Sequence, residues 1–267
     1  MTQRKNAADP VKPYLTGAPT DENTIRQSLK FFAILLLSMF MTFLVCSLTG
    51  FQSAVLRIIV NIAIEGLILT VFFTKGADYG TDAVARGEIL YQHVEKGTEI
   101  TASERKIPYH PLKGLVIGLA GSAVLFVVAV ILAFTAEKQM TGAGVLPSWT
   151  DAYMRRSEFS MALSQYSQGS DMTFTDILRL IVRIMQMPFI SMAGAENRGA
   201  LLLIERLSPL LVLLPAVAYG TGYMQGPSRR RIIHKEIALN RKKRISREKR
   251  ERKARAARKP SGPEQLN

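Results

Sequence analysis

Four long apolar runs constrain the fold of this chain more than any other feature. Residues 31–49 contain no charged side chain, and further apolar runs follow at 51–74, 115–135 and 200–219. A helix rises about 1.5 Å per residue, so about 20 apolar residues cross a hydrocarbon core of about 30 Å. A soluble helical bundle would require a polar stripe along most of these segments, and the stripes are missing. We therefore predict an all-α, polytopic membrane protein with four transmembrane helices.

The distribution of positive charge predicts how these spans are oriented. Residues 229–259 contain 16 Lys and Arg residues against 3 Glu residues, a net +13 of the +14 carried by the whole chain. Positive loops and tails stay on the cytoplasmic side, so we expect both termini in the cytoplasm, in a plasma membrane or a bacterial inner membrane. The expected segments are a cytoplasmic N-terminal tail (1–30), a transmembrane hairpin (31–74), a cytoplasmic loop (75–112), a third span (113–135), an external region (136–198), a fourth span (199–224) and a basic cytoplasmic tail (225–267).

A fifth run, residues 173–194, mixes apolar and charged positions. Its polar residues recur at i, i+3, i+7 and i+10, and on a helix they form one narrow stripe: Asp176, Arg179, Arg183 and Gln186. Pro188 should end or kink that helix. Two arginines at the centre of a span would be unfavourable. We expect an interfacial amphipathic helix near 174–187; the alternative is a fifth span, which would place the 75–112 loop outside.

Polar side chains interrupt the second and fourth runs, and they are the candidate intramembrane site: Arg57, Asn61, Glu65, Glu205 and Arg206. The first three are spaced four residues apart and share one helix face. Arg57 and Glu205 each lie six residues into their spans, and an ionisable residue in hydrocarbon should face the bundle and find a partner. We expect an Arg57–Glu205 ion pair and a hydrogen-bonded Glu65. The functional alternative is a small transporter or channel subunit that uses these residues.

No residue pattern predicts catalysis, a cofactor or a metal. The sequence lacks a phosphate loop, an HExxH motif, a dinucleotide fingerprint and a GxSxG elbow. His93 and His110 do not have metal-ligand spacing, and the single cysteine, Cys46, excludes an intramolecular disulfide. We therefore expect a non-enzymatic membrane component, or an accessory subunit of an oligomer or complex, with no catalytic residues, no metal and no cofactor.

Two shorter segments carry local expectations. Thr81 or Asp82 can cap a short helix in the 75–112 loop, and Gly97 can stop it. The segment YGTGY, residues 219–223, ends the fourth span. Tyr219 and Tyr223 are expected in an aromatic belt at the membrane interface.

The basic tail is predicted to be helical when bound and otherwise disordered. Its first half has the apolar residues Ile232, Ile233, Ile237 and Leu239, which suit the inner leaflet, while its second half is almost entirely charged and has no aromatic residue. Base stacking is therefore not expected, and contacts to phosphate or to acidic groups remain. The predicted polyanion-binding residues are Arg241, Lys242, Lys243, Arg244, Arg247, Lys249, Arg250, Arg252 and Lys253.

Three kinds of partner fit such a tail. It can attract anionic lipid headgroups and fix the topology, bind a ribosome or other RNA through phosphates, or dock an acidic protein. In composition alone, the tail resembles those with which membrane insertases hold ribosomes, and that resemblance implies a ribosome as partner. The spans do not match those insertases, so the resemblance is confined to the tail.

Overall fold

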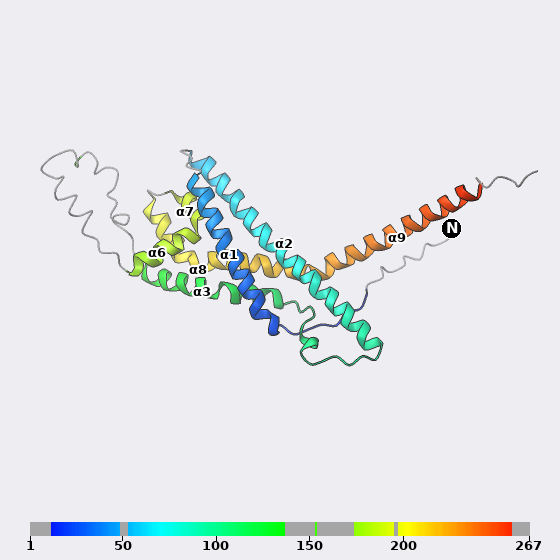
Figure 1. The fold of residues 1–267 in the computed structure, drawn as a ribbon. Helices are drawn as coiled ribbons and strands as arrows, with labels where there is room; N and C mark the ends of the chain where they lie inside the picture. Colours follow the sequence, from blue (N-terminus) through cyan, green and yellow to red (C-terminus); the bar gives the residue numbers. More distant parts are fainter. Residues whose placement is uncertain (1–11, 49–52, 137–152, 154–173, 195–196, 258–267) are drawn as a thin grey trace, which may run out of the picture.

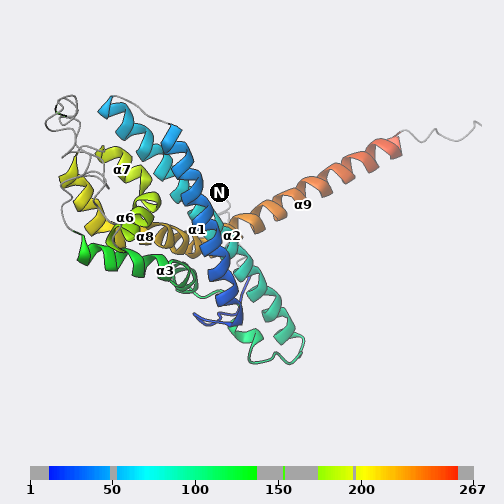
Figure 2. The ribbon, with the colours of Figure 1, turned by 60° about the vertical axis from the view of Figure 1, so that its left-hand side comes forward.

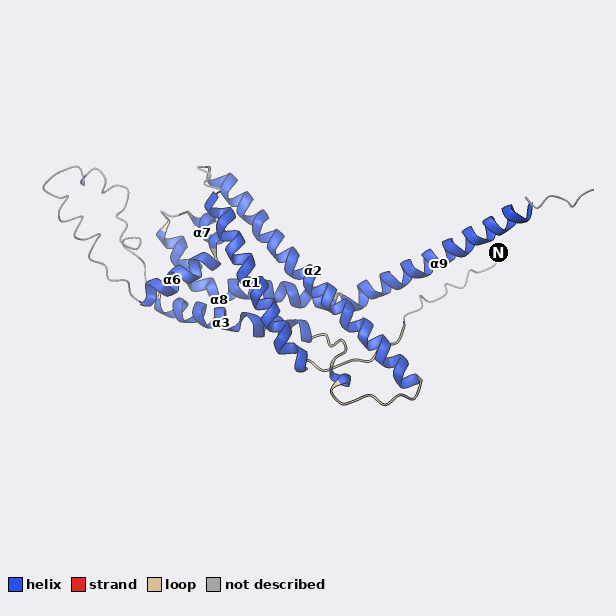
Figure 3. Ribbon diagram, in the orientation of Figure 1, coloured by secondary structure: helices blue, strands red, loops and turns tan. Residues whose placement is uncertain are grey.

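The computed structural model describes residues 12–48, 53–136, 153, 174–194 and 197–257 (Figure 1). The predicted turn near Gly50, most of the external region and the two chain ends lie outside these residues. Figure 3 shows that the described residues form helices and connecting loops, with no strand among them. Four helices are long and apolar enough to cross a membrane, as predicted: α1 (Glu22–Leu48), α2 (Ala54–Glu95), α3 (Lys113–Thr135) and α8 (Arg198–Met224).

The helix α8 is the centre of the bundle. The helices α3 and α2 pack along it, α1 packs on α3, and α1 and α2 make few contacts with each other (Figures 1 and 2). Buried apolar side chains fill the space between these helices, among them Phe31, Phe72, Ile117 and Val212. Many outward-facing side chains are also large and apolar, such as Phe40, Ile59 and Leu210. Such a surface suits contact with lipid chains rather than with water.

The closest helix contact joins α2 to α8. A Cβ atom at Gly76 would overlap the backbone oxygen of Tyr219, and a Cβ atom at Gly222 would overlap the backbone oxygen of Phe73. Glycine is required at both positions because the two backbones touch there. This is how small residues allow helices to approach closely in a membrane, where van der Waals packing replaces much of the hydrophobic driving force.

The two tyrosines of the YGTGY segment lie inside the bundle. Tyr223 is fully buried and stacks on Tyr109, with ring centroids 5.3 Å apart and an interplanar angle of 9°. Tyr219 meets the ring of Phe31 edge to face at 5.2 Å. The prediction of an interfacial aromatic belt is therefore wrong. The close backbone contact between α2 and α8 brings this segment into the core.

The helix α2 is longer than its apolar run. Its 42 residues extend about 63 Å, about twice the thickness of a hydrocarbon core. It continues through the segment where a separate helix capped by Thr81 or Asp82 is predicted, so that prediction is wrong. The predicted stop is confirmed, because Gly97 follows the helix with φ of 74°.

The residues that precede α1 bind the extended part of α2 and the loop before α3. The amide of Leu15 donates to the Gly87 carbonyl at 3.2 Å, and the amide of Gly17 donates to the Tyr109 carbonyl at 2.9 Å. This loop holds a short 3₁₀ turn, η1 (Glu104–Lys106). The N-terminal segment therefore ties α2 to α3 at the end of the bundle where the fourth span finishes.

Two short helices, α6 (Phe174–Met185) and α7 (Met187–Ala193), fill the other end of the bundle. The helix α6 packs on α1, α3 and α8, while α7 packs on α1, α2 and α8. They meet at Gln186, and Pro188 lies in the first turn of α7, which confirms the predicted break. The outward face of α6 is apolar, with Ile177 and Leu180 exposed, whereas Arg179 is buried.

A substitution tests the contact between α2 and α8. We expect Gly76→Leu to lower the thermal unfolding midpoint of the detergent-solubilised protein, because overpacking a tight contact destabilises by about 1–3 kcal/mol or more. The matched control is Gly66→Leu on the same helix, since a Cβ atom at Gly66 meets no atom within 4 Å. Equal midpoints for the two variants would contradict the close approach of the backbones.

Candidate functional site

A buried charge cluster joins α6 to α8. The Oε2 atom of Glu205 accepts a hydrogen bond from Nε of Arg179 at 3.0 Å. Its Oε1 atom accepts from Nε of Arg183 at 3.0 Å and from the second nitrogen of that guanidinium at 2.7 Å. The carboxylate of Asp176 lies 3.3 Å from Arg179, so the described part of the cluster holds two acidic and two basic side chains. The side chain of Glu205 is only 4% exposed, and this pairing offsets the desolvation of its charge.

The predicted ion pair between Arg57 and Glu205 is wrong. The Arg57 guanidinium packs against Gly194 at the end of α7, and its buried Nε atom has no hydrogen-bond partner among the described residues. Equal depth along two helices does not make two side chains face each other. The helix α7 occupies the side of α2 from which Arg57 projects, while Glu205 faces α6.

Asn61 connects three helices. It is fully buried, and its side-chain nitrogen donates to the Arg57 carbonyl at 2.8 Å and to the Ser191 hydroxyl at 3.0 Å. Its side-chain oxygen accepts from the Cys46 thiol at 3.3 Å. The structure thus gives Asn61 a packing role between α1, α2 and α7.

The other two predicted intramembrane residues lie apart from these networks. Arg206 is exposed on α8, next to the buried Glu205. Glu65 is half-buried and lines a cavity between α1, α2 and α8. The described residues offer its carboxyl group no hydrogen bond, so the hydrogen-bonded Glu65 expected from the sequence is not found among them.

A second charge cluster joins α2 to the basic C-terminal helix, α9 (Gly226–Ala257). Arg230 and His234 bind the two carboxylate oxygens of Glu88, at 2.9 and 2.7 Å. Arg229 lies 3.2 Å from the carboxylate of Asp78. The helix α9 starts two residues after α8 ends, and a Cβ atom at Gly226 would overlap the backbone of α2. These contacts fix the direction in which α9 leaves the bundle (Figures 1 and 2).

Glu88 lies outside the membrane-spanning part of α2. It follows Ala54 by 34 residues, a helical distance of about 51 Å that exceeds the hydrocarbon thickness. Burial alone would raise the pKa of its carboxyl group. Hydrogen bonds from Arg230 and His234, together with their charges, outweigh that effect and hold the pKa below its usual value.

The rest of α9 projects away from the bundle, and the side chains of residues 235–254 are exposed. All nine residues predicted to bind a polyanion lie there and are exposed, from Arg241 to Lys253. The pair formed by Arg244 and Glu248, at 3.0 Å, lies along the same helix. The structure therefore presents these positive side chains on one helix, and their binding of a polyanion stays a prediction.

Sequence reasoning missed the roles of Arg179, Arg183, Glu88 and His234. The polar stripe of Asp176, Arg179 and Arg183 predicts a helix at the membrane interface. A stripe this narrow is also compatible with two arginines that bind one buried acidic residue, which is what the structure has. Nothing local distinguishes Glu88 from other acidic residues, because its partners lie more than 140 positions away.

Comparison with known proteins gives no match: no protein-family model, no curated protein and no solved structure matches this chain. The described residues also contain no group of three or more His, Cys, Asp or Glu side chains placed to hold a metal ion. The function is therefore argued from the charge clusters, the basic helix and the cavity.

The Glu205 cluster generates one prediction. We expect Glu205→Gln to lower stability by about 3–5 kcal/mol, since removing one partner of a buried ion pair strands the other charges. Adding Arg179→Met to that variant should restore part of the loss. Melting of the single and double variants in detergent measures this coupling.

The neighbouring Arg206→Gln is the control for this series, because Arg206 is exposed. Its thermal unfolding midpoint should stay near that of the wild type. Additive effects of the Glu205 and Arg179 substitutions would show that the contact contributes nothing to stability.

The Glu88 cluster generates another prediction. It is measured as the distance between two spin labels, attached to cysteines that replace Gln92 and Lys242 in a Cys46→Ser background. Glu88→Gln should broaden the distance distribution between the labels at neutral pH, because α9 loses its anchor. A lowered carboxyl pKa contributes stability above its unfolded value of about 4.5 and loses it as pH falls through the folded value. In the chain that keeps Glu88, the distance distribution should therefore stay narrow at neutral pH. It should broaden only when the pH falls below about 4.5, through the lowered pKa of the folded state.

The control for Glu88 is Glu95→Gln, an exposed residue at the end of the same helix. It should leave the distance distribution narrow. A narrow distribution in Glu88→Gln would mean that the hydrogen bonds to Arg230 and His234 do not position α9.

Proposed function

We propose that this chain is a non-enzymatic, multi-pass membrane component that holds an RNA-containing partner, such as a ribosome, through α9. The observation that supports this proposal is the exposed basic helix anchored at its base by Glu88 and the contact with α2. To fix the orientation of the spans in the membrane, a flexible basic tail would be sufficient. A helix with a set direction instead presents its charges to a partner at a defined position.

The proposed orientation places both termini in the cytoplasm of a plasma membrane or a bacterial inner membrane. The positive charge of α9 supports it, as do the five Lys and Arg residues of segment 75–112, because the orientation rule counts basic residues rather than net charge. In this orientation, α6 and α7 lie near the external interface. The apolar outward face of α6 would contact lipid there, while its arginines bind Glu205.

The chemistry of α9 favours phosphate groups over other partners. Beyond His234 the helix extends about 35 Å, and its second half has basic side chains on every face. A helix that lies on lipid needs an apolar face, and a protein interface needs an apolar core. RNA backbones require neither, because Arg and Lys bind their phosphates directly. Apolar residues near its base, such as Ile232 and Ile237, remain available for the inner leaflet.

Binding of a short RNA duplex to the full chain in neutral-lipid nanodiscs tests this function. A helix that neutralises about six phosphates should lose about 10³-fold in affinity between about 50 and 200 mM salt. The triple variant Arg247→Gln, Arg250→Gln, Lys253→Gln should bind more weakly, and the slope of log affinity against log salt should fall by about 2–3.

The matched control removes three positive charges from the loop before α3, in Lys96→Gln, Arg105→Gln, Lys106→Gln. It should leave the RNA affinity and the salt slope nearly unchanged, and a reporter fused after Asn267 should place the C-terminus in the cytoplasm for both triple variants. Equal weakening by the two triple variants would contradict a role for α9. Stronger binding to polyglutamate, or binding only to anionic vesicles, would assign α9 to an acidic protein or to lipid and overturn the RNA proposal.

A further inference from the structure

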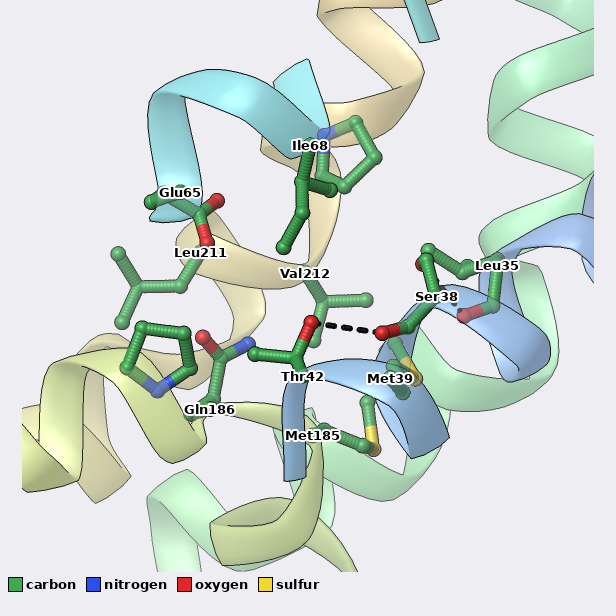
Figure 4. A pocket seen from close by; sticks show the side chains of 12 residues that line it. Leu35, Ser38, Met39, Thr42, Glu65, Ile68, Met185, Gln186, Leu211 and Val212 are labelled. Carbon is green, nitrogen blue, oxygen red and sulfur yellow. Dashed lines mark hydrogen bonds between the residues drawn. The ribbon is translucent and has the colours of Figure 1, made fainter. Parts of the chain in front are cut away.

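A partly open cavity of about 30 Å³ lies between the membrane-spanning helices. Figure 4 shows its lining, which combines apolar walls with polar groups from Ser38 and Thr42 on α1, Glu65 on α2, and Gln186 at the break between α6 and α7. Glu65 follows the first residue of α2 by 11 positions, about 17 Å along the helix and thus near the middle of the hydrocarbon. The volume suffices for one or two waters or one small ion.

The polar lining is rich in oxygen atoms that can accept or coordinate. The Ser38 hydroxyl donates to the Leu35 carbonyl at 2.8 Å, and the Thr42 hydroxyl donates to the Ser38 carbonyl at 2.6 Å. Each hydroxyl proton is therefore used within α1, and the oxygen lone pairs remain for another group. Among the residues that the structure describes, no lysine, arginine or histidine lines the cavity. Oxygen ligands of this kind suit hard cations rather than anions.

A proline inside α8 and the break between α6 and α7 border the same cavity. Pro215 lies inside α8 and lines the cavity together with Leu211. Because proline has no N–H group, the Leu211 carbonyl loses its usual helical donor. On another side, α6 ends and α7 begins at Gln186. Interrupted helices in the middle of a membrane supply carbonyl groups to ion sites.

The charge of the Glu65 carboxylate indicates what kind of ion could balance it. No salt bridge or hydrogen bond reaches its carboxyl group from the residues that the structure describes, and the Arg57 guanidinium lies two helical turns away against Gly194. A carboxylate at this depth needs a neutralising charge. One carboxylate balances one monovalent cation, whereas Ca²⁺ or Mg²⁺ sites use more charged ligands or several waters.

We propose that this cavity binds a sodium ion, with Glu65 as the charged ligand and the oxygens of Ser38, Thr42 and Gln186 completing its coordination. The site is separate from α9 and does not depend on the function proposed for that helix. Sodium would neutralise Glu65 and join α1, α2 and the break between α6 and α7.

Thermal unfolding of the full chain in detergent tests the site, with sodium replaced by choline at constant ionic strength. Sodium at about 100 times its dissociation constant should raise the wild-type midpoint by about 5 °C. Ser38→Ala should shift the sodium dependence to higher concentration. Glu65→Gln should abolish it, and Glu95→Gln, which removes an exposed carboxylate of the same helix, should retain it. A wild-type midpoint that does not respond to sodium, or a response kept in Glu65→Gln, would overturn the proposal.

A second measurement needs no variant that could fail to fold. Dicyclohexylcarbodiimide modifies protonated carboxyl groups in apolar surroundings, and mass spectrometry locates the modified residue. Sodium should slow modification of wild-type Glu65 at neutral pH, while choline should not. If Glu65 is modified at the same rate in both salts, the cavity holds only a proton or water, and the sodium site is refuted.

Discussion

The backbone contact between α2 and α8 sets the position of almost every other element. Gly76 and Gly222 allow the two helices to touch, and the packing of α8 against α3 then completes a three-helix core. Hydrophobic burial contributes little to association between helices in lipid, so shape complementarity at such a contact has more influence than in a soluble bundle. The contact also occurs where α2 leaves its apolar run. Everything that follows in α2 is therefore held in a fixed relation to the end of α8.

That relation determines the direction of the basic helix. The helix α9 starts where α8 ends, its first residue touches the backbone of α2, and Glu88 holds Arg230 and His234 a few turns later. The positive charge of the first turns is thus partly neutralised within the chain. Residues 235–254 keep an excess of positive charge and are exposed. The extension of α2 accordingly divides the tail into a part that contacts α2 and an exposed part that projects away, a division that charge alone does not show.

The sequence predicts the four spans well, because length and hydropathy decide them with little help from tertiary contacts. It also predicts the break at Pro188 and the stop at Gly97, since both depend on backbone chemistry.

The sequence does not predict features that depend on the rotation of one helix relative to another. Arg57 and Glu205 share a depth but face different neighbours, and Tyr219 lies in the core because glycines beside it permit a close contact. The sequence predicts a helix after Thr81 but not its continuity with the second span, because the contacts of the N-terminal segment with this part of α2 have no hydropathy signal.

The buried charges of the spans differ in how they are neutralised, and the difference carries functional meaning. Glu205 has two arginines within hydrogen-bond distance, so its charge is balanced by the fold itself. These ion pairs join α6 to α8. Glu65 lies deeper in its span than Glu205, beside hydroxyl oxygens and a proline inside α8, and the described residues provide it with no basic partner. Desolvation penalises that carboxylate unless a proton or a cation joins it. The fold therefore neutralises the buried carboxylate of Glu205 itself, whereas the described residues bring no basic group to the half-buried carboxylate of Glu65.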